Sequence, residues 1–172
     1  MTNDKQTELD ETHFKVISQW EHYAFLSLLE TDDFEFDLDW ISKRLGISKL
    51  RVEQVIDHLV GLKLIEKNNQ TITKNFSSLK TSEDIQSQAI QKSHEETVHM
   101  AIEKLKELEP IWRDFSSITM TMDPDQIPEA KKLIREFRKK FSLLMESGKK
   151  KEVYRLQLMF YPLTQIDADQ KK

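Results

Sequence analysis

The segment between Asp37 and Lys74 restricts the possible folds of this chain more than any other part. Within it, Gly46 follows a short apolar periodic stretch and suits the left-handed position that ends a helix. Ser48 then precedes a second periodic stretch and can cap it as a helix. An apolar Leu64-Ile65 pair follows, and then the polar Asn68-Asn69 pair, whose tolerance of positive φ suits a tight hairpin. Two helices joined by a glycine turn and followed by a hairpin predict a winged helix-turn-helix.

Candidate contacts with duplex DNA lie on the second of these helices and on the hairpin. In a winged helix the start of the second helix faces outward, and the hairpin reaches beside it. Basic side chains suit phosphate or guanine at such positions, and amide side chains suit adenine. The sequence therefore predicts DNA contacts by Ser48, Lys49, Arg51, Gln54, Lys67, Asn68 and Asn69.

The charge of this segment keeps a second interpretation open. Residues 36–75 hold seven basic and five acidic residues, which gives a net charge of +2. Phosphate contacts dominate the affinity of proteins for DNA, and so small a charge attracts phosphates only weakly. The alternative is a winged helix that contacts another protein instead of DNA.

Helical and strand patterns also lie outside this segment. Helical periodicity starts near Thr12, and a long helix is predicted from about Thr81 to Glu109. Residues 115–122 and 153–161 alternate between apolar and polar side chains, which is typical of half-buried strands. A helix over residues 128–146 joins these two stretches and completes a predicted β-α-β element.

The predicted fold class is therefore α+β, and the chain is mainly α-helical. We expect a winged-helix domain over residues 12–76 and a second domain over residues 82–164 that holds the long helix and the β-α-β element. His22, on the aromatic first helix, is expected to be a hydrogen-bonded packing residue. Inward positions of the first domain predict largely buried side chains for Trp20, Trp40, Leu45, Leu59 and Ile65.

A second basic surface is predicted on the helix over residues 128–146. Its apolar residues fall within an arc of about 120°, and basic residues occupy the opposite side. Such a face can contact phosphates or an acidic partner. The alternative is the ordinary solvated side of an amphipathic helix, because solvation alone would place the charges there. The basic residues are Lys131, Lys132, Arg135, Arg138 and Lys139, and Lys149-Lys150-Lys151 continue them.

The composition argues against an enzyme. The chain has no cysteine, which excludes thiolate zinc sites and cysteine nucleophiles, and its three glycines cannot supply a phosphate-binding loop. His94, Glu95 and His99 resemble a zinc-binding helix, but the second histidine lies five residues after the first, where four are needed. We therefore expect no catalytic residue, no metal and no cofactor.

The sequence also predicts where the protein resides. The first residues, MTNDKQTELDETH, have neither a basic start nor an apolar run, so no signal peptide is predicted. No stretch approaches the roughly 20 apolar residues that a membrane span needs. We expect a cytoplasmic protein without a membrane partner, and the lack of cysteine fits a reducing compartment.

Six segments, spanning about residues 14–164, resemble a known family. They are FKVISQWEHYAFLSLLE, DLDWISKRLGIS, VEQVIDHLVGLKLIE, SQAIQKSHEE, RDFSSITMTMDPDQIPEAKKLIREFRKK and EVYRLQLMFYPLT. On these segments the chain resembles an uncharacterised bacterial family of presumed transcriptional regulators, a domain of unknown function. Longer members resemble a repressor-type helix-turn-helix followed by this domain, and the chain corresponds to the second part. The resemblance implies no established activity.

These observations predict a transcriptional regulator that binds duplex DNA through a winged helix. The alternative function is a protein-interaction adaptor in which the winged helix does not read DNA. The two strands predicted in the second half leave open edges, and an isolated two-stranded sheet is marginal in water. We therefore expect a homodimer through the second half, which would also place two reading helices on a palindromic DNA site.

Overall fold

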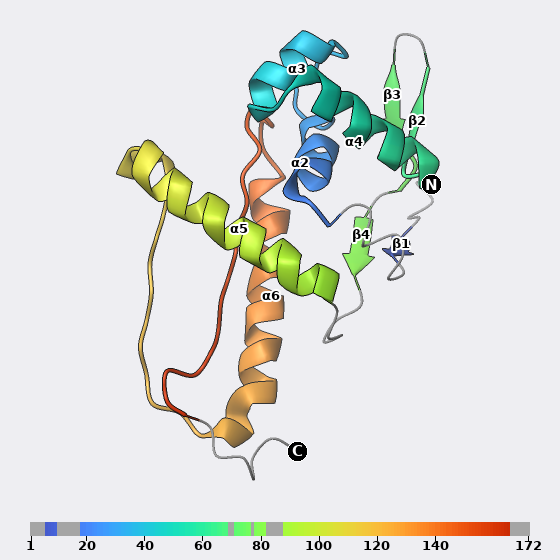
Figure 1. Cartoon of the computed structure of the whole chain (residues 1–172). Coiled ribbons are helices and arrows are strands. Elements are labelled where there is room, and N and C mark those ends of the chain that lie inside the picture. Colours follow the sequence, from blue (N-terminus) through green and yellow to red (C-terminus); the bar gives the residue numbers. More distant parts are fainter. Residues whose placement is uncertain (1–5, 10–17, 69–70, 77, 82–87, 166–172) are drawn as a thin grey trace. The chain divides into compact units, whose positions relative to one another are not determined.

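The computed structural model describes residues 6–9, 18–68, 71–76, 78–81 and 88–165. These residues form helices and two small two-stranded sheets (Figure 1), so the α+β class is confirmed. The chain divides into two compact units, each described here by itself. The larger unit contains the described residues up to 118 together with 150–153, and the smaller contains 119–149 together with those from 154 onwards.

Three helices and a hairpin, here called the α2–β3 region (residues 18–76), make up most of the larger unit. The two helices and the hairpin expected between residues 37 and 74 are present, whereas the helix start expected near Thr12 lies outside the described residues. Strands β2 and β3 pair in antiparallel fashion. The elements are α2 (Trp20–Leu28), α3 (Leu38–Leu45), α4 (Lys49–Gly61), β2 (Ile65–Lys67) and β3 (Ile72–Lys74).

Local capping explains where α3 and α4 begin and end. The side chain of Asp37 accepts a hydrogen bond of 2.8 Å from the backbone N–H of Trp40 at the start of α3. Gly46 ends α3 with φ of 68°, in the left-handed region that glycine adopts without a steric penalty. The Ser48 hydroxyl accepts a hydrogen bond of 3.2 Å from the backbone N–H of Arg51, which caps α4. The short turn between the two helices is therefore set by residues of its own.

The core of the larger unit is apolar and is built from α2, α3, α4 and the first strand of the hairpin with the residue before it, while Ile72 of β3 packs against it. Leu59 and Ile65 are buried, as the sequence predicts. Trp40 and Leu45 are partly buried and pack against this core, and Trp20 is also partly buried. The buried apolar residues are Phe25, Leu26, Leu28, Ile41, Val52, Val55, Ile56, Leu59, Leu64 and Ile65.

The larger unit also contains a second pair of strands and a long helix. Strand β1 (Gln6–Leu9) pairs in parallel with β4 (Ser78–Thr81), and neither strand was predicted from the sequence. The long helix α5 (Gln88–Glu107) is confirmed, while the start expected near Thr81 falls at residues that are not described. A short 3-10 turn, η1 (Pro110–Trp112), follows α5, as expected from a proline that cannot continue a helix.

The smaller unit contains η2 (Pro124–Gln126) and the long helix α6 (Ile127–Met145). The predicted helix over residues 128–146 is confirmed, but the predicted β-α-β element is wrong, because neither 115–122 nor 153–161 contains a strand. A strand needs a neighbouring strand to receive its backbone hydrogen bonds, and the described residues offer these two stretches no such neighbour. Alternation of apolar and polar residues alone does not supply the pairing that a strand needs.

Candidate interaction surface on α4 and the β2–β3 hairpin

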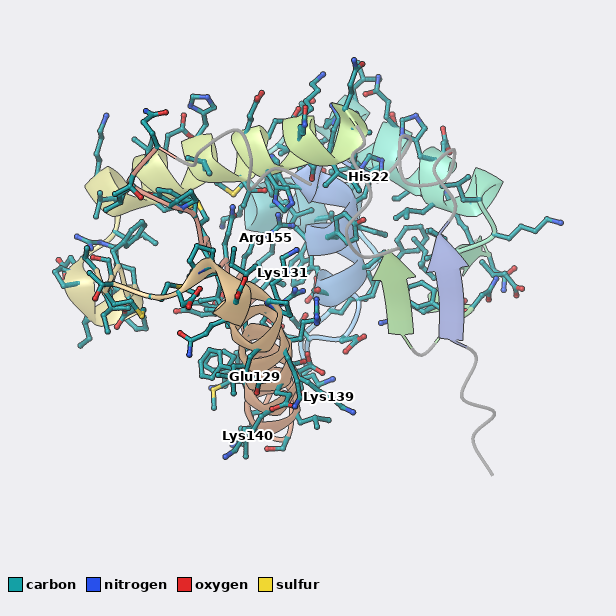
Figure 2. The ribbon with its side chains drawn as sticks, turned by 90° about the horizontal axis from the view of Figure 1, so that it is seen from below. His22, Glu129, Lys131, Lys139, Lys140 and Arg155 are labelled. Carbon is teal, nitrogen blue, oxygen red and sulfur yellow. The ribbon has the colours of Figure 1, made fainter. Side chains whose placement is uncertain are left out.

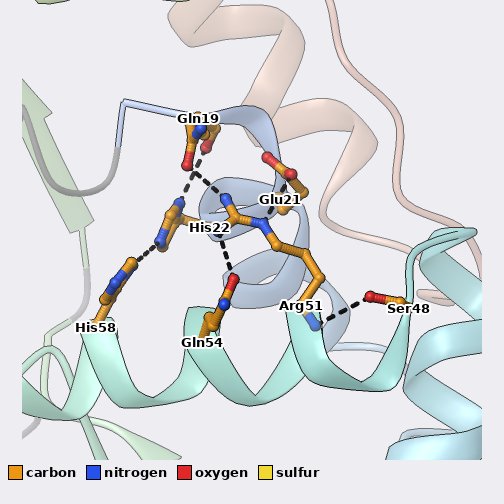
Figure 3. A network of polar contacts seen from close by, with 7 residues as sticks. All are labelled: Gln19, Glu21, His22, Ser48, Arg51, Gln54 and His58. Atoms are coloured by element: carbon orange, nitrogen blue, oxygen red, sulfur yellow. Dashed lines mark hydrogen bonds and ion pairs between the residues drawn. The ribbon is translucent and has the colours of Figure 1, made fainter.

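Arg51 lies at the centre of a polar network that joins α4 to the start of α2 (Figure 3). Its Nε donates to Glu21 Oε1 at 3.1 Å, and its Nη2 donates to the side-chain oxygen of Gln19. Its Nη1 donates to Gln54 Oε1 at 3.3 Å. The side chains of Arg51 and Glu21 are only 22% and 14% exposed. The expected outward orientation of Arg51 is therefore wrong, because acceptors from α2 hold its guanidinium inward.

A pair of histidines continues the same contact between α2 and α4. His22 is fully buried, and its Nε2 lies 3.0 Å from Nδ1 of His58, with the two rings stacked at 5.3 Å between centroids. His22 Nδ1 lies 3.3 Å from the carbonyl oxygen of Gln19, so a neutral His22 can donate there and accept from His58. Burial is the main cause that lowers the pKa of His22 to about 4. The expectation that His22 is a hydrogen-bonded packing residue is confirmed.

Lys49, at the start of α4, is also engaged within the chain. Its ammonium lies 2.5 Å from Asp39 Oδ1 on α3, and the hydrogen bond with Asp39 raises the pKa of Lys49. Both side chains remain more than half exposed, so solvent screens the pair. Lys49 thus meets solvent with its charge already paired.

The hairpin carries the remaining predicted contact residues. The Lys67 ammonium lies 5.9 Å from the centroid of the Phe36 ring, within the range of a cation–π contact. The backbone N–H of Asn68 donates to the carbonyl oxygen of Thr71 at 2.9 Å, which closes the hairpin, and the Asn68 side chain is exposed. Asn69 lies outside the described residues. The structure therefore brings Ser48, Arg51 and Gln54 together on α4, and it places Lys67 and Asn68 separately on the hairpin.

The side of α4 that faces solvent carries an apolar residue and two acids, and we call it the α4 outer face. Its members share the side opposite the buried Val52, Val55, Ile56 and Leu59, and Leu50 is 65% exposed. The spacing of 3 and 7 residues from Leu50 to Glu53 and Asp57 was visible in the sequence, and it marks one helix face. The α4 outer face consists of Leu50, Glu53, Gln54 and Asp57, all of them exposed.

Residues 150–153 contact the turn that follows α2, which the sequence did not reveal. The Lys150 ammonium donates to Glu30 Oε2 at 2.8 Å, and the backbone N–H of Asp32 donates to the Lys150 carbonyl oxygen at 2.8 Å. Burial raises the pKa of Glu30, but hydrogen bonds from Lys150 and Lys74 outweigh it and lower the pKa overall. Lys150, expected on a basic surface, is therefore bound to an acid.

Arg44 holds the same segment from the side of α3. Its Nη1 lies 3.1 Å from Glu152 Oε1, and its Nη2 donates to the Lys151 carbonyl oxygen at 2.6 Å. Val153 packs, partly buried, against the core. The segment 150–153 thus belongs to the fold of the larger unit although it is distant in sequence.

The second predicted basic surface lies on α6. Figure 2 shows Glu129, Lys131, Lys139 and Lys140 projecting from this helix. Lys132 forms an exposed ion pair with Glu129 at 3.7 Å, and Arg135 is partly buried. The remaining members, Lys131, Arg138 and Lys139, are exposed. Contact of this face with phosphates or an acidic partner stays a prediction.

Among the described residues, no group of three or more histidine, aspartate or glutamate side chains is placed to hold a metal ion. His94, Glu95 and His99 all lie on α5, where His94 and His99 are exposed. None of the helices in the described part of the chain is long and apolar enough to cross a lipid bilayer.

Comparison with known proteins identifies the family to which the chain belongs. A model of a domain of unknown function, DUF4423, matches residues 1–163. The chain belongs to this family. No curated protein and no solved structure matches the chain. The resemblance to a domain-of-unknown-function family is therefore confirmed, and the regulatory role and bacterial origin that it implied stay predictions.

Proposed function

We propose that the α2–β3 region of this DUF4423 protein is a winged-helix domain that binds another protein through the α4 outer face. The order of α3, the Gly46 turn, Ser48-capped α4 and the β2–β3 hairpin supports the winged-helix assignment. The observation that carries the function is the engagement of Arg51, a basic residue at the start of α4, by Glu21 and Gln19 of the same chain.

The chemistry of the α4 outer face supports a protein partner over DNA. Leu50 is an exposed aliphatic residue that DNA could not use beyond a thymine methyl group, and Glu53 and Asp57 would face phosphates with like charge. An aliphatic group beside two carboxylates instead fits a peptide that carries an aliphatic side chain flanked by lysine or arginine.

The charge of the whole α2–β3 region points the same way. Residues 18–76 hold ten acidic and seven basic residues, which gives a net charge of −3. A protein that binds duplex DNA gains most of its affinity from neutralised phosphates, which needs a basic surface. A basic peptide segment is the better electrostatic match.

Duplex DNA is the second candidate ligand, favoured by the exposed Lys67 and Asn68 beside α4. A hairpin with a basic and an amide side chain is the part of a winged helix that reaches along DNA. In this candidate the hairpin, rather than Arg51, makes the main contacts.

One set of variants tests both candidates. Random peptides displayed on phage are selected against the immobilised full chain, and the enriched sequences are expected to combine an aliphatic residue with lysine or arginine. Leu50→Asp is expected to abolish this enrichment. The matched control is Ile102→Asp, which changes an exposed aliphatic residue of α5 and should leave the enrichment intact.

The DNA arm uses the anisotropy of a labelled random duplex of about 30 base pairs at about 50 mM salt, where charge-driven binding is strong. We expect no binding. Duplex binding that Lys67→Ala weakens and Leu50→Asp leaves unchanged would establish the DNA candidate and refute the protein-binding proposal. Absence of peptide enrichment over the Leu50→Asp chain would refute it as well.

A further inference from the structure

Within the smaller unit, taken by itself, helix α6 presents a continuous apolar stripe that the described residues leave largely exposed. None of its 19 residues is buried. Leu133 is 57% exposed, Phe137 50% and Leu144 57%. The stripe consists of Ala130, Leu133, Phe137, Phe141 and Leu144, which share one side of the helix.

An amphipathic helix of this kind needs a partner for its apolar side. Helices gain most of their stability in proteins from packing such a face against other parts of a structure. Contiguous exposed apolar surface on a protein usually marks an interaction site. The stripe is accordingly a candidate contact surface, and its pattern provides an argument for what covers it.

The spacing of the stripe is symmetric about Phe137. Ala130 and Leu144 lie seven residues on either side of it, and Leu133 and Phe141 lie four residues on either side. Two copies of α6 that run antiparallel about a two-fold axis at Phe137 therefore meet in register. Leu133 comes level with the partner subunit's Phe141, and the small Ala130 comes level with the partner subunit's Leu144. Large residues facing small ones allow the helices to pack closely.

The charges on α6 are compatible with this pairing. At about 100° per residue, Lys131, Lys132, Arg135, Arg138 and Lys139 all lie at least about 100° from the direction of Phe137, away from the contact. Lys140 is the basic residue nearest the stripe, and it shares a flank with Glu136. A two-fold axis at Phe137 would bring Lys140 to within about one helical half-turn of the partner subunit's Glu136, and the reciprocal pair would form as well.

We propose that a second copy of this chain covers the stripe, with α6 packed antiparallel against α6 of the partner about a two-fold axis at Phe137. The contact is isologous, as most homodimer interfaces are. It does not depend on the function proposed above, since it uses the smaller unit and no residue of the α4 outer face.

Sedimentation equilibrium of the full chain at tens of micromolar tests the association. The expected mass is twice 20.4 kDa, about 41 kDa. Phe137→Glu is expected to lower it to that of a single chain. Lys139→Glu introduces the same side chain on the opposite side of α6 and should leave the dimer intact. A wild-type mass of one chain, or a dimer that Phe137→Glu leaves intact, would overturn the proposal.

Single cysteines test the geometry, because the natural chain contains none. Phe137→Cys should cross-link to itself under mild oxidation. Leu133→Cys alone should not, since the two copies would lie eight residues apart along the axis, about 12 Å, beyond the reach of a disulfide. A mixture of Leu133→Cys and Phe141→Cys chains should cross-link to each other. Cross-linking by Leu133→Cys alone would indicate parallel helices and refute the antiparallel contact, even if Phe137→Glu failed to fold.

Discussion

Helices α4 and α6 have the same kind of amphipathic pattern and opposite surroundings. In α4, Val52, Val55, Ile56 and Leu59 are all buried, whereas α6 buries no residue along its length. Periodicity alone therefore states which side of a helix is apolar and leaves open what covers that side. In the larger unit the cover comes from α2, α3 and β2 of the same chain. For α6 we propose that it comes from a second copy.

The largest expected effect on the free energy of unfolding comes from truncating one leucine to alanine in each helix. Leu59→Ala should lower the free energy of unfolding by about 2–5 kcal/mol, because it leaves a cavity in a closed core. Its cost should not depend on protein concentration. Leu133→Ala should instead shift the urea midpoint by an amount that depends on protein concentration, since the residue is buried only in the dimer.

Urea unfolding followed by circular dichroism at two concentrations, about tenfold apart, measures both effects. The comparison of the two helices would be contradicted if the loss of stability in Leu59→Ala depended on protein concentration. It would also be contradicted if the loss in Leu133→Ala did not.

The same contrast explains which parts of the structure the sequence could predict. Gly46 and Ser48 act on their own neighbours, so the ends of α3 and α4 were predictable from a few residues. The orientation of Arg51 was not, because its acceptors Glu21 and Gln19 lie 30 and 32 residues away. The β-α-β prediction failed for a related reason, since alternation indicates an extended chain while strand pairing needs a distant partner.

The α4 outer face could have been predicted from helix spacing, since Leu50, Glu53 and Asp57 lie opposite the buried apolar positions of the helix. The site prediction instead followed residue type and selected the basic and amide side chains. Segment 150–153 was beyond sequence reasoning, because its contacts with Glu30 and Arg44 span more than 100 residues.

The polar sides of α4 and α6 also differ, because Arg51 of α4 is largely buried and Arg138 of α6 is exposed. The second prediction compares the two arginines. Arg51→Ala should destabilise the fold by about 1–3 kcal/mol, since it leaves the largely buried Glu21 without its charged partner. Arg138→Ala on the exposed side of α6 should change stability by less than about 0.5 kcal/mol. Urea unfolding of the two variants measures the difference.

The double variant Glu21→Gln/Arg51→Ala identifies the cause. It should recover part of the loss, because it removes the unpaired charge. Equal stability of the Arg51→Ala and wild-type chains would show that the network in Figure 3 does not join α2 to α4.

The smallest expected effect is a dependence of stability on pH that arises from His22, where α2 meets α4. The His22 pKa is about 4 in the folded chain against an ordinary 6.5, so the unfolded chain binds more protons between these values. Above pH 6.5 His22 is neutral in both states and does not lower the stability of the fold. As the pH falls from 6.5 towards 4, only the unfolded chain takes up this proton, and the folded chain loses stability relative to it. Besides burial, His58 and Arg51 also lower the pKa of the His22 ring, whereas the Glu21 carboxylate raises it.

Stability should thus decrease from pH 6.5 to 5, by no more than about 1.4 kcal/mol per pH unit, the limit for one proton. This range lies above the region where Glu30 takes up its proton, since the pKa of Glu30 is itself lowered. His22→Gln keeps an amide that can donate to the Gln19 carbonyl and should flatten the slope. His99→Gln, which changes an exposed histidine of α5, should leave the slope unchanged. A slope that persists in His22→Gln would assign the pH dependence to another group and separate it from the contact between α2 and α4.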